Sequence, residues 1–143
     1  MAYESQFSLD DFEPYNSARR FRKKTYQLIR QLPNEEKYCL GNQMRRAAVS
    51  VSNNIAEGHG RWYYQENAKF CRTSRGSVGE LIDDFNVCVD ENYGNPRLVE
   101  ELRGEARQLI ARINSYIAYL LRSKQGEPSE VEQCQAKTTQ NPR

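Results

Sequence analysis

The feature that most constrains the fold is the spacing of apolar residues, which recur at steps of three and four along the whole central part of the chain. That period places them on one side of an α-helix, whereas a half-buried strand would need steps of two. Four such runs follow one another, and no part of the central chain requires a strand. The pattern therefore predicts an all-α protein.

Strong helix-breaking signals separate the four runs. Pro33 ends the first, Gly58 ends the second, and the turn Asn-Tyr-Gly-Asn-Pro at 92–96 separates the third from the fourth. Short connections of this kind bring each helix back alongside the preceding one. We therefore expect an antiparallel, up-down-up-down four-helix bundle over residues 15–122. The expected starts of the helices are Pro14, Glu35, Trp62 or Tyr63, and Pro96.

Each run has an apolar stripe that predicts the inner face of its helix. A chain of 143 residues is long enough for one core built from such stripes and too short to expect two. The expected core residues, run by run, are Ala18, Phe21, Thr25, Leu28, Ile29 and Leu32; Leu40, Met44, Ala47, Ala48, Val51 and Ile55; Phe70, Ser74, Ser77, Val78, Leu81, Phe85 and Cys88; and Leu98, Leu102, Ala106, Leu109, Ile113, Tyr116, Ile117 and Leu120.

The two ends of the chain differ in composition from the predicted bundle. Residues 1–14 carry four acids and no base, and residues 123–143 hold two Pro, one Gly and almost no large apolar residue. We predict a flexible acidic arm over 1–14 and a disordered polar tail over 123–143. Because the chain shows neither a secretion signal nor an apolar run of membrane-spanning length, we expect a cytoplasmic protein that does not contact the membrane.

Few residues are available for metal or redox chemistry. The four cysteines are scattered without a Cys-x-x-Cys pair and the chain has one His, which argues against a zinc site. We expect no metal, no other cofactor, and reduced, partly buried thiols. The Glu-x-x-His pairs of di-iron bundles are also missing, so the acids of the third run are expected to form a solvated or salt-bridged face. These acids are Glu80, Asp83, Asp84, Asp90 and Glu91.

The segment SNNIAEGHGRW, residues 52–62, places the chain's only His and only Trp around a Gly-x-Gly pair. In a nucleotide-binding loop the glycines follow a strand and open a helix, but here they end one helix before the next begins. The order favours a left-handed helix cap at Gly58 with the second glycine in the turn. Two functional alternatives stay open: an anion held by Arg61, and acid–base catalysis by His59 with Glu57.

Positive charge is concentrated in one part of the sequence. Residues 15–62 hold ten Lys and Arg against three acids, although the net charge of the whole chain is only +2. Such segregation is typical of a surface that binds a polyanion or an acidic protein, although a basic helix face can also be merely solvated. The residues that we predict to contact nucleic acid are Arg19, Arg20, Lys23, Lys24, Arg30, Arg45, Arg46 and Arg61, with Tyr26, Trp62, Tyr63 and Tyr64 available for stacking on bases.

Three positions indicate contact between copies of the chain. Gly76 and Gly79 lie opposite an apolar stripe, where each costs about 1 kcal/mol relative to Ala without a visible benefit to the core of one chain. Val49 points away from the core stripe of its own helix, within a run of small and β-branched residues. We predict that these three residues line the interface of a homo-oligomer. The alternative is that the small residues only relax packing constraints.

Two long motifs resemble a known family. QMRRAAVSVSNNIAEGHGR at 43–61 is similar to the signature of bacterial four-helix-bundle proteins encoded in intervening sequences of 23S ribosomal RNA genes, and FCRTSRGSVGEL at 70–81 resembles their third-helix pattern. The resemblance covers residues 15–122 and implies a bundle that assembles as a ring-shaped homopentamer. Related bundles are accessory proteins of diversity-generating retroelements, in which a basic pentamer binds the reverse transcriptase and nucleic acid. The residues that match the signature, to which the family assigns no catalytic role, are Arg45, Arg46, Asn54, Glu57, Gly58, Gly60 and Arg61.

Residues and resemblance together predict a non-enzymatic, oligomeric protein that binds RNA or DNA phosphates through the basic face of its first two helices. The main alternative is an accessory scaffold that docks a reverse transcriptase or another acidic protein on the same face. A third interpretation is an enzyme that uses His59 with Glu57, although no nucleophile, metal ligand or second His accompanies this pair.

Overall fold

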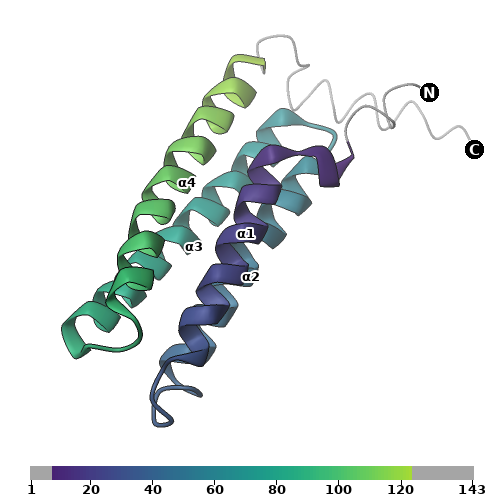
Figure 1. The fold of residues 1–143 in the computed structure, drawn as a ribbon. Coiled ribbons are helices and arrows are strands. Elements are labelled where there is room, and N and C mark those ends of the chain that lie inside the picture. Colours follow the sequence, from purple (N-terminus) through teal and green to yellow (C-terminus); the bar gives the residue numbers. More distant parts are fainter. Residues whose placement is uncertain (1–7, 124–143) are drawn as a thin grey trace, which may run out of the picture.

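A computed structural model of the chain describes residues 8–123, which form a short 3₁₀-helix and four α-helices. The α-helices lie side by side as a bundle (Figure 1). No strand occurs among residues 8–123, so the predicted all-α fold with four helices is confirmed. The elements are η1 (Leu9–Asp11), α1 (Glu13–Arg30), α2 (Leu40–His59), α3 (Tyr64–Glu91) and α4 (Pro96–Ser123).

Each helix packs mainly against two others: α1 and α3 both contact α2 and α4. Polar contacts of small side chains accompany the packing of α2 on α3. The hydroxyl oxygens of Ser50 and Ser77 are 2.8 Å apart, and the Ser74 hydroxyl donates to the carbonyl of Val51 at 2.7 Å. Because serine side chains are small, the backbones of α2 and α3 can approach closely at these positions.

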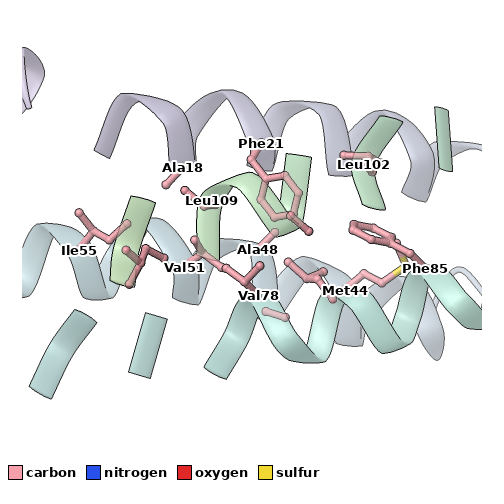
Figure 2. Close-up of a cluster of buried hydrophobic side chains, with 14 of the residues drawn as sticks. Ala18, Phe21, Met44, Ala48, Val51, Ile55, Val78, Phe85, Leu102 and Leu109 are labelled. Atoms are coloured by element: carbon pink, nitrogen blue, oxygen red, sulfur yellow. The ribbon is translucent and has the colours of Figure 1, made fainter. Parts of the chain in front are cut away.

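The core lies between the four helices, and side chains from all of them meet there (Figure 2). Every core residue predicted for α1, the following Leu32 and α2 is buried. Phe70, Leu98 and Tyr116 are only partly buried, whereas Val99 is buried although it was not predicted. Phe21 and Phe85 meet edge to face with ring centres 6.1 Å apart. Within residues 8–123 no helix combines the length and hydrophobicity that crossing a membrane requires.

The connections between the helices differ in part from the prediction. The second helix begins at Leu40 instead of near Glu35, because the chain after Pro33 first forms turns in which the Glu36 amide donates to the Pro33 carbonyl at 2.9 Å. The third helix ends as predicted, with Asn92 as a left-handed cap at φ 57°. Gly94 has a φ of 72°, a left-handed conformation that glycine adopts without strain.

The first described residues pack on one end of the bundle, and the flexible arm predicted for residues 1–14 stays a prediction. After η1, the Phe12 ring stacks on the His59 ring with centres 4.6 Å apart and meets Tyr116 edge-on at 5.0 Å. The apolar side chain of Phe12, which follows two acidic residues, thus packs against the rings of His59 and Tyr116. Residues 1–7 and 124–143, and with them nearly all of the predicted polar tail, lie outside the described residues.

Candidate nucleic-acid interface

Basic side chains of α1 and α2 lie beside the line along which these two helices pack. Arg22 Nη1 donates to Ser52 Oγ at 2.7 Å, and the guanidinium of Arg45 lies 5.7 Å from the centre of the Tyr26 ring. Both contacts join α1 to α2. Arg22 was not predicted as a site residue, because the amino-acid sequence does not reveal that its side chain reaches the Ser52 hydroxyl on the neighbouring helix.

Exposed bases of α1 extend this region along the helix. Arg19, Lys23 and Arg30 are exposed and follow one another near helical spacing, on the same side as Tyr26. Arg19 Nη1 lies 3.9 Å from Asp10 Oδ1, and the Arg19 guanidinium lies over the Tyr15 ring. Within residues 8–123, Lys23 and Arg30 form no ion pair. We call the following five residues the α1–α2 basic surface: Arg19, Arg22, Lys23, Arg30 and Arg45. Arg46 is also exposed, about 100° around α2 from Arg45.

Negative charge is missing from most of these two helices. Between Glu13 and Glu57 the sequence contains two acids, Glu35 and Glu36, and both lie in the connection before α2. The α1–α2 basic surface therefore has no acid within its own helices between those two residues. Unopposed charges of one sign give a surface potential that attracts ligands of the opposite sign.

Arg20 and Lys24 belong to a different side of α1. Lys24 Nζ lies 2.6 Å from a carboxylate oxygen of Glu105 and 2.9 Å from one of Glu101, both on α4. These carboxylates raise the pKa of Lys24 above its ordinary value. Successive helical residues point about 100° apart, so Arg20 and Lys24, each one position after Arg19 and Lys23, lie on the side of α1 next to α4. The structure therefore divides the predicted set of bases into two groups.

Arg61 lies apart from both groups, in the connection between α2 and α3. Its Nη2 is 3.3 Å from Glu57 Oε2, and its guanidinium covers the Phe70 ring at 4.9 Å. Trp62 follows directly and is 83% exposed. Of the four aromatic residues predicted to stack on bases, Trp62 is the one whose ring is most open, since Tyr26, Tyr63 and Tyr64 are partly buried.

The prediction of a left-handed cap at Gly58 is wrong. Gly58 lies inside α2 and is buried, and the helix is capped by Gly60 with an ordinary right-handed φ of −78°. A Cβ atom on Gly58 would lie 2.6 Å from Asn67 Oδ1 and 3.0 Å from Phe70 Cβ. The glycine is needed because the start of α3 approaches α2 closely. Both roles place a glycine near a helix end, so the sequence alone does not distinguish them.

The suggested catalytic pair is engaged in contacts that hold this end of the bundle. His59 is half-buried and stacks on Phe12, and the Glu57 carboxylate accepts a hydrogen bond from Arg61. No group of three or more His, Cys, Asp or Glu residues that could hold a metal ion occurs in the part of the chain that the structure describes.

The residues predicted to line an interface between copies are on the outside of the bundle. Val49 is 43% exposed, and a Cβ atom on Gly76 or Gly79 would meet nothing within 4 Å. In contrast, the small residues Ala47 and Ala48 beside Val49 are buried within the chain. Packing of α2 against its neighbours within the chain therefore explains why Ala47 and Ala48 are small. It does not explain the exposed Val49.

Three buried titratable side chains were missed or only partly anticipated. Asp84 is 2% exposed instead of solvated, and its Oδ2 has no hydrogen-bond partner among the described residues. Burial, with smaller effects of the nearby Asp83 and Glu80 charges, raises the pKa of Asp84 to about 6. Burial likewise raises the pKa of Cys71 and of Cys88 to about 11, so both thiols are protonated at neutral pH.

Comparison with known proteins identifies one family. Residues 10–115 match the model of the family described as 23S rRNA-intervening sequence protein. The match begins within η1, ends within α4 and includes both sequence motifs. A search of curated proteins found no match.

Proposed function

The chain belongs to the 23S rRNA-intervening sequence protein family, and from this premise we propose that it is a non-enzymatic protein that binds nucleic acid through the α1–α2 basic surface. The observation that carries the proposal is the separation of charge: the bases of α1 and α2 lie together, and no acid of the same helices lies between Glu13 and Glu57. Contacts of Arg and Lys with phosphates supply affinity without sequence recognition. Such a role implies the cytoplasm as the compartment.

The α1–α2 basic surface depends on the direction of the helices, which we infer to alternate up-down-up-down. Contact pairs support this order, because residue numbers fall on one helix as they rise on its neighbour. Asn67 of α3 donates to Tyr116 of α4, and further along α3 Arg75 donates to Asn114. Alternating directions place the start of α1 beside the end of α2, so Arg19 and the exposed Trp62 lie at the same end of the bundle.

Trp62 supplies a direct readout of binding, since it is the chain's single Trp and its ring is exposed. We expect its fluorescence to change when a structured RNA is added at low salt. The logarithm of the binding constant should then fall linearly with the logarithm of salt concentration, by roughly 0.7 to 0.9 for each phosphate contacted. An affinity that does not depend on salt, or no binding at low salt, would contradict the proposal. A partner that co-purifies and stays bound after nuclease treatment would identify an acidic protein, such as a reverse transcriptase, as the ligand instead.

The non-enzymatic part of the proposal rests on the contacts of His59 and Glu57. A general acid or base needs access to the substrate, but the His59 ring is stacked on Phe12 and the Glu57 carboxylate is paired with Arg61. A phosphodiesterase activity that is lost in His59→Ala would show that this assignment is wrong.

We also propose that the chain assembles with copies of itself, as the ring-shaped homopentamer that the family resemblance implies, through Val49, Gly76 and Gly79. Support comes from the exposure of Val49 and from the open space above both glycines, where a Cβ atom would meet none of residues 8–123 within 4 Å. A ring would repeat the α1–α2 basic surface and strengthen weak phosphate contacts through avidity.

The double substitution Gly76→Leu and Gly79→Leu tests this assembly. Because a Cβ atom at either position would meet no described atom within 4 Å, we expect the monomer to remain folded while the assembly dissociates. Sedimentation velocity measures the mass, and circular dichroism checks the helix content. Gly104→Leu is the matched control, since Gly104 is a helical glycine on α4 that is also open and lies outside the proposed interface. An intact assembly of the double variant, or equal dissociation of the control, would contradict the assignment.

A further inference from the structure

A second charged site lies on the other side of α1, in a cleft between α1 and α4. The cleft has a volume of about 410 Å³. Phe21 and Leu109, both buried, form its apolar base, and Ser17, Arg20, Gln108 and Arg112 also line it. The position of Arg20 and Arg112 here separates them from the α1–α2 basic surface.

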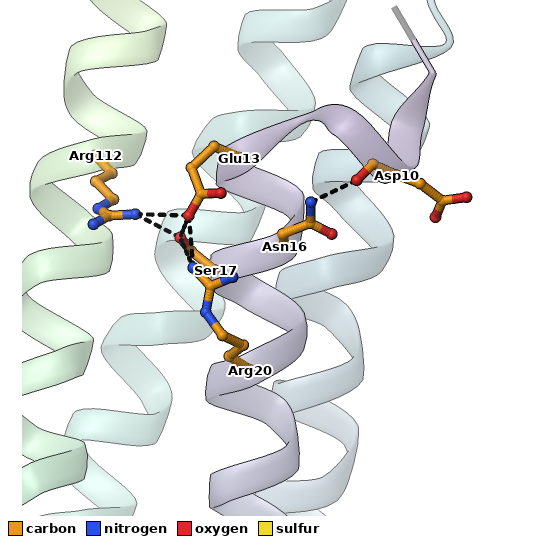
Figure 3. A network of polar contacts seen from close by, with 6 residues as sticks. All are labelled: Asp10, Glu13, Asn16, Ser17, Arg20 and Arg112. Atoms are coloured by element: carbon orange, nitrogen blue, oxygen red, sulfur yellow. Dashed lines mark hydrogen bonds and ion pairs between the residues drawn. The ribbon is translucent and has the colours of Figure 1, made fainter.

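Three residues that line this cleft, Ser17, Arg20 and Arg112, donate hydrogen bonds to one oxygen atom of Glu13 (Figure 3). Glu13 Oε1 accepts a hydrogen bond from Arg20 Nη2 at 2.6 Å, one from the Ser17 hydroxyl at 3.0 Å and one from Arg112 Nη1 at 3.3 Å. Arg112 Nη1 also donates to Ser17 Oγ at 2.6 Å, which holds α4 against α1 at this point. Two guanidinium groups and a hydroxyl thus surround a single carboxylate oxygen.

We propose that this cluster is a phosphate-binding site, in which the Glu13 carboxylate occupies the place of a phosphate oxygen until a ligand displaces it. The ligand class is a phosphate group, either free or as a terminal phosphomonoester. Guanidinium groups suit this ligand because their planar, fixed donors match the geometry of phosphate oxygens. A phosphate dianion would balance the charges of Arg20 and Arg112, whereas Glu13 balances one of them.

The exposure of the cluster makes the exchange feasible. The side chains of Glu13, Arg20 and Arg112 are 60%, 63% and 52% exposed. Ion pairs with this exposure contribute little to stability, so a competing anion can replace the carboxylate. The guanidinium of Arg20, and after it the hydroxyl of Ser17, hold the pKa of Glu13 below its ordinary value, so the cluster favours a negative charge.

The other charges of the cleft confine the site to this end. Lys24 is paired with Glu101 and Glu105, so its charge is already compensated and the two carboxylates repel an anion from that region. The proposal does not depend on nucleic-acid binding by the α1–α2 basic surface, since the two groups of bases share no residue.

The experiment titrates the full chain at constant ionic strength with inorganic phosphate and, separately, with a 5′-phosphorylated dinucleotide. Binding is followed by NMR shifts of the Arg guanidinium N–H groups and of the Gln108 side-chain amide. We expect saturable binding to the wild type, and in Glu13→Gln an affinity about fivefold higher, the factor that an exposed ion pair of ordinary strength represents. Arg112→Gln should lose the binding. Arg107→Gln, which removes an exposed charge elsewhere on α4, should bind as the wild type does.

Two results would overturn the proposal: no saturable shift with either ligand, or equal affinities of the wild type, Glu13→Gln and Arg112→Gln. Binding of inorganic phosphate alone would identify free phosphate as the ligand, and stronger binding of the phosphorylated dinucleotide would identify the end of a nucleic acid. Helix content by circular dichroism separates loss of binding from loss of fold in each variant.

Discussion

Gly58→Ala is expected to lower the free energy of unfolding by up to about 2 kcal/mol, because overpacking a well-filled site costs about 1–3 kcal/mol and alanine returns about 1 kcal/mol in a helix interior. The new methyl group would overlap Asn67 Oδ1 and press on the Asn67 carbonyl and on Phe70 Cβ. Asn67 cannot easily move away, because it is buried and its amide donates to the Tyr116 hydroxyl at 2.9 Å. This cost should exceed the gain of about 1 kcal/mol that alanine brings to a helix interior.

Urea denaturation measures this difference, and Gly60→Ala provides its control. Gly60 is exposed, has a φ that alanine readily adopts, and would place its Cβ at ordinary contact distances of 3.7 Å. The control should therefore be neutral or stabilised by up to about 1 kcal/mol through the reduced freedom of its unfolded chain. Equal stabilities of the two variants would contradict the assignment of Gly58 to close packing of α2 against α3.

The second prediction concerns Asp84: we expect its ionisation to lower the free energy of unfolding of the wild type as pH rises. Its pKa is raised from 3.8 to about 6 in the folded state, chiefly by burial. Below about pH 4 the carboxyl is protonated in both states, and between about pH 4 and pH 6 the unfolded state loses the proton first, which favours unfolding. A difference of two pKa units corresponds to about 3 kcal/mol, reached above the folded-state pKa.

Replacement of Asp84 by Asn removes this ionisation. The free energy of unfolding of the wild type should therefore fall relative to Asp84→Asn between about pH 4 and pH 7, in denaturation curves recorded at each pH. Asp90→Asn is the control, since Asp90 is an exposed acid on the same helix and the substitution removes the same charge without altering the buried carboxyl. Parallel profiles of the wild type and Asp84→Asn would show that the buried carboxyl does not govern stability in this range.

The fold could largely be predicted from the sequence because its signals are local and repeated. Steps of three and four identified all six core residues of α2, and the turn at 92–96 separated α3 from α4 as expected. The predicted start of α2 near Glu35 was wrong, since the polar residues after Pro33 fit a helix and a turn equally well. The apolar period of a helix is a pattern among residues close in sequence, so the sequence contains it in full, whereas the role of Gly58 depends on how closely α3 approaches α2.

The candidate site was harder to predict, because it depends on which residues of other helices lie opposite. Arg19 and Arg20 are neighbours in sequence, yet the first faces the α1–α2 basic surface and the second faces Arg112 of α4. Lys23 and Lys24 cannot be told apart by residue type or position in the sequence, yet the charge of Lys24 is compensated by two carboxylates of α4. The burial of Asp84 and the packing of Phe12 on His59 also depend on contacts between elements far apart in the chain.

The most direct test of nucleic-acid binding by the α1–α2 basic surface compares two charge variants that have the same net charge. The first combines Lys23→Gln, Arg30→Gln and Arg45→Gln; the control combines Arg97→Gln, Arg107→Gln and Arg122→Gln, which are exposed bases of α4. Affinity for a structured RNA is measured over a range of salt concentrations. The account predicts that the first variant binds more weakly. The slope of the logarithm of its binding constant against the logarithm of salt concentration should be smaller by roughly 2 to 3, the contribution of three phosphate contacts. The control should keep the slope of the wild type. Equal losses in both variants would show that net charge alone, and not this surface, determines binding.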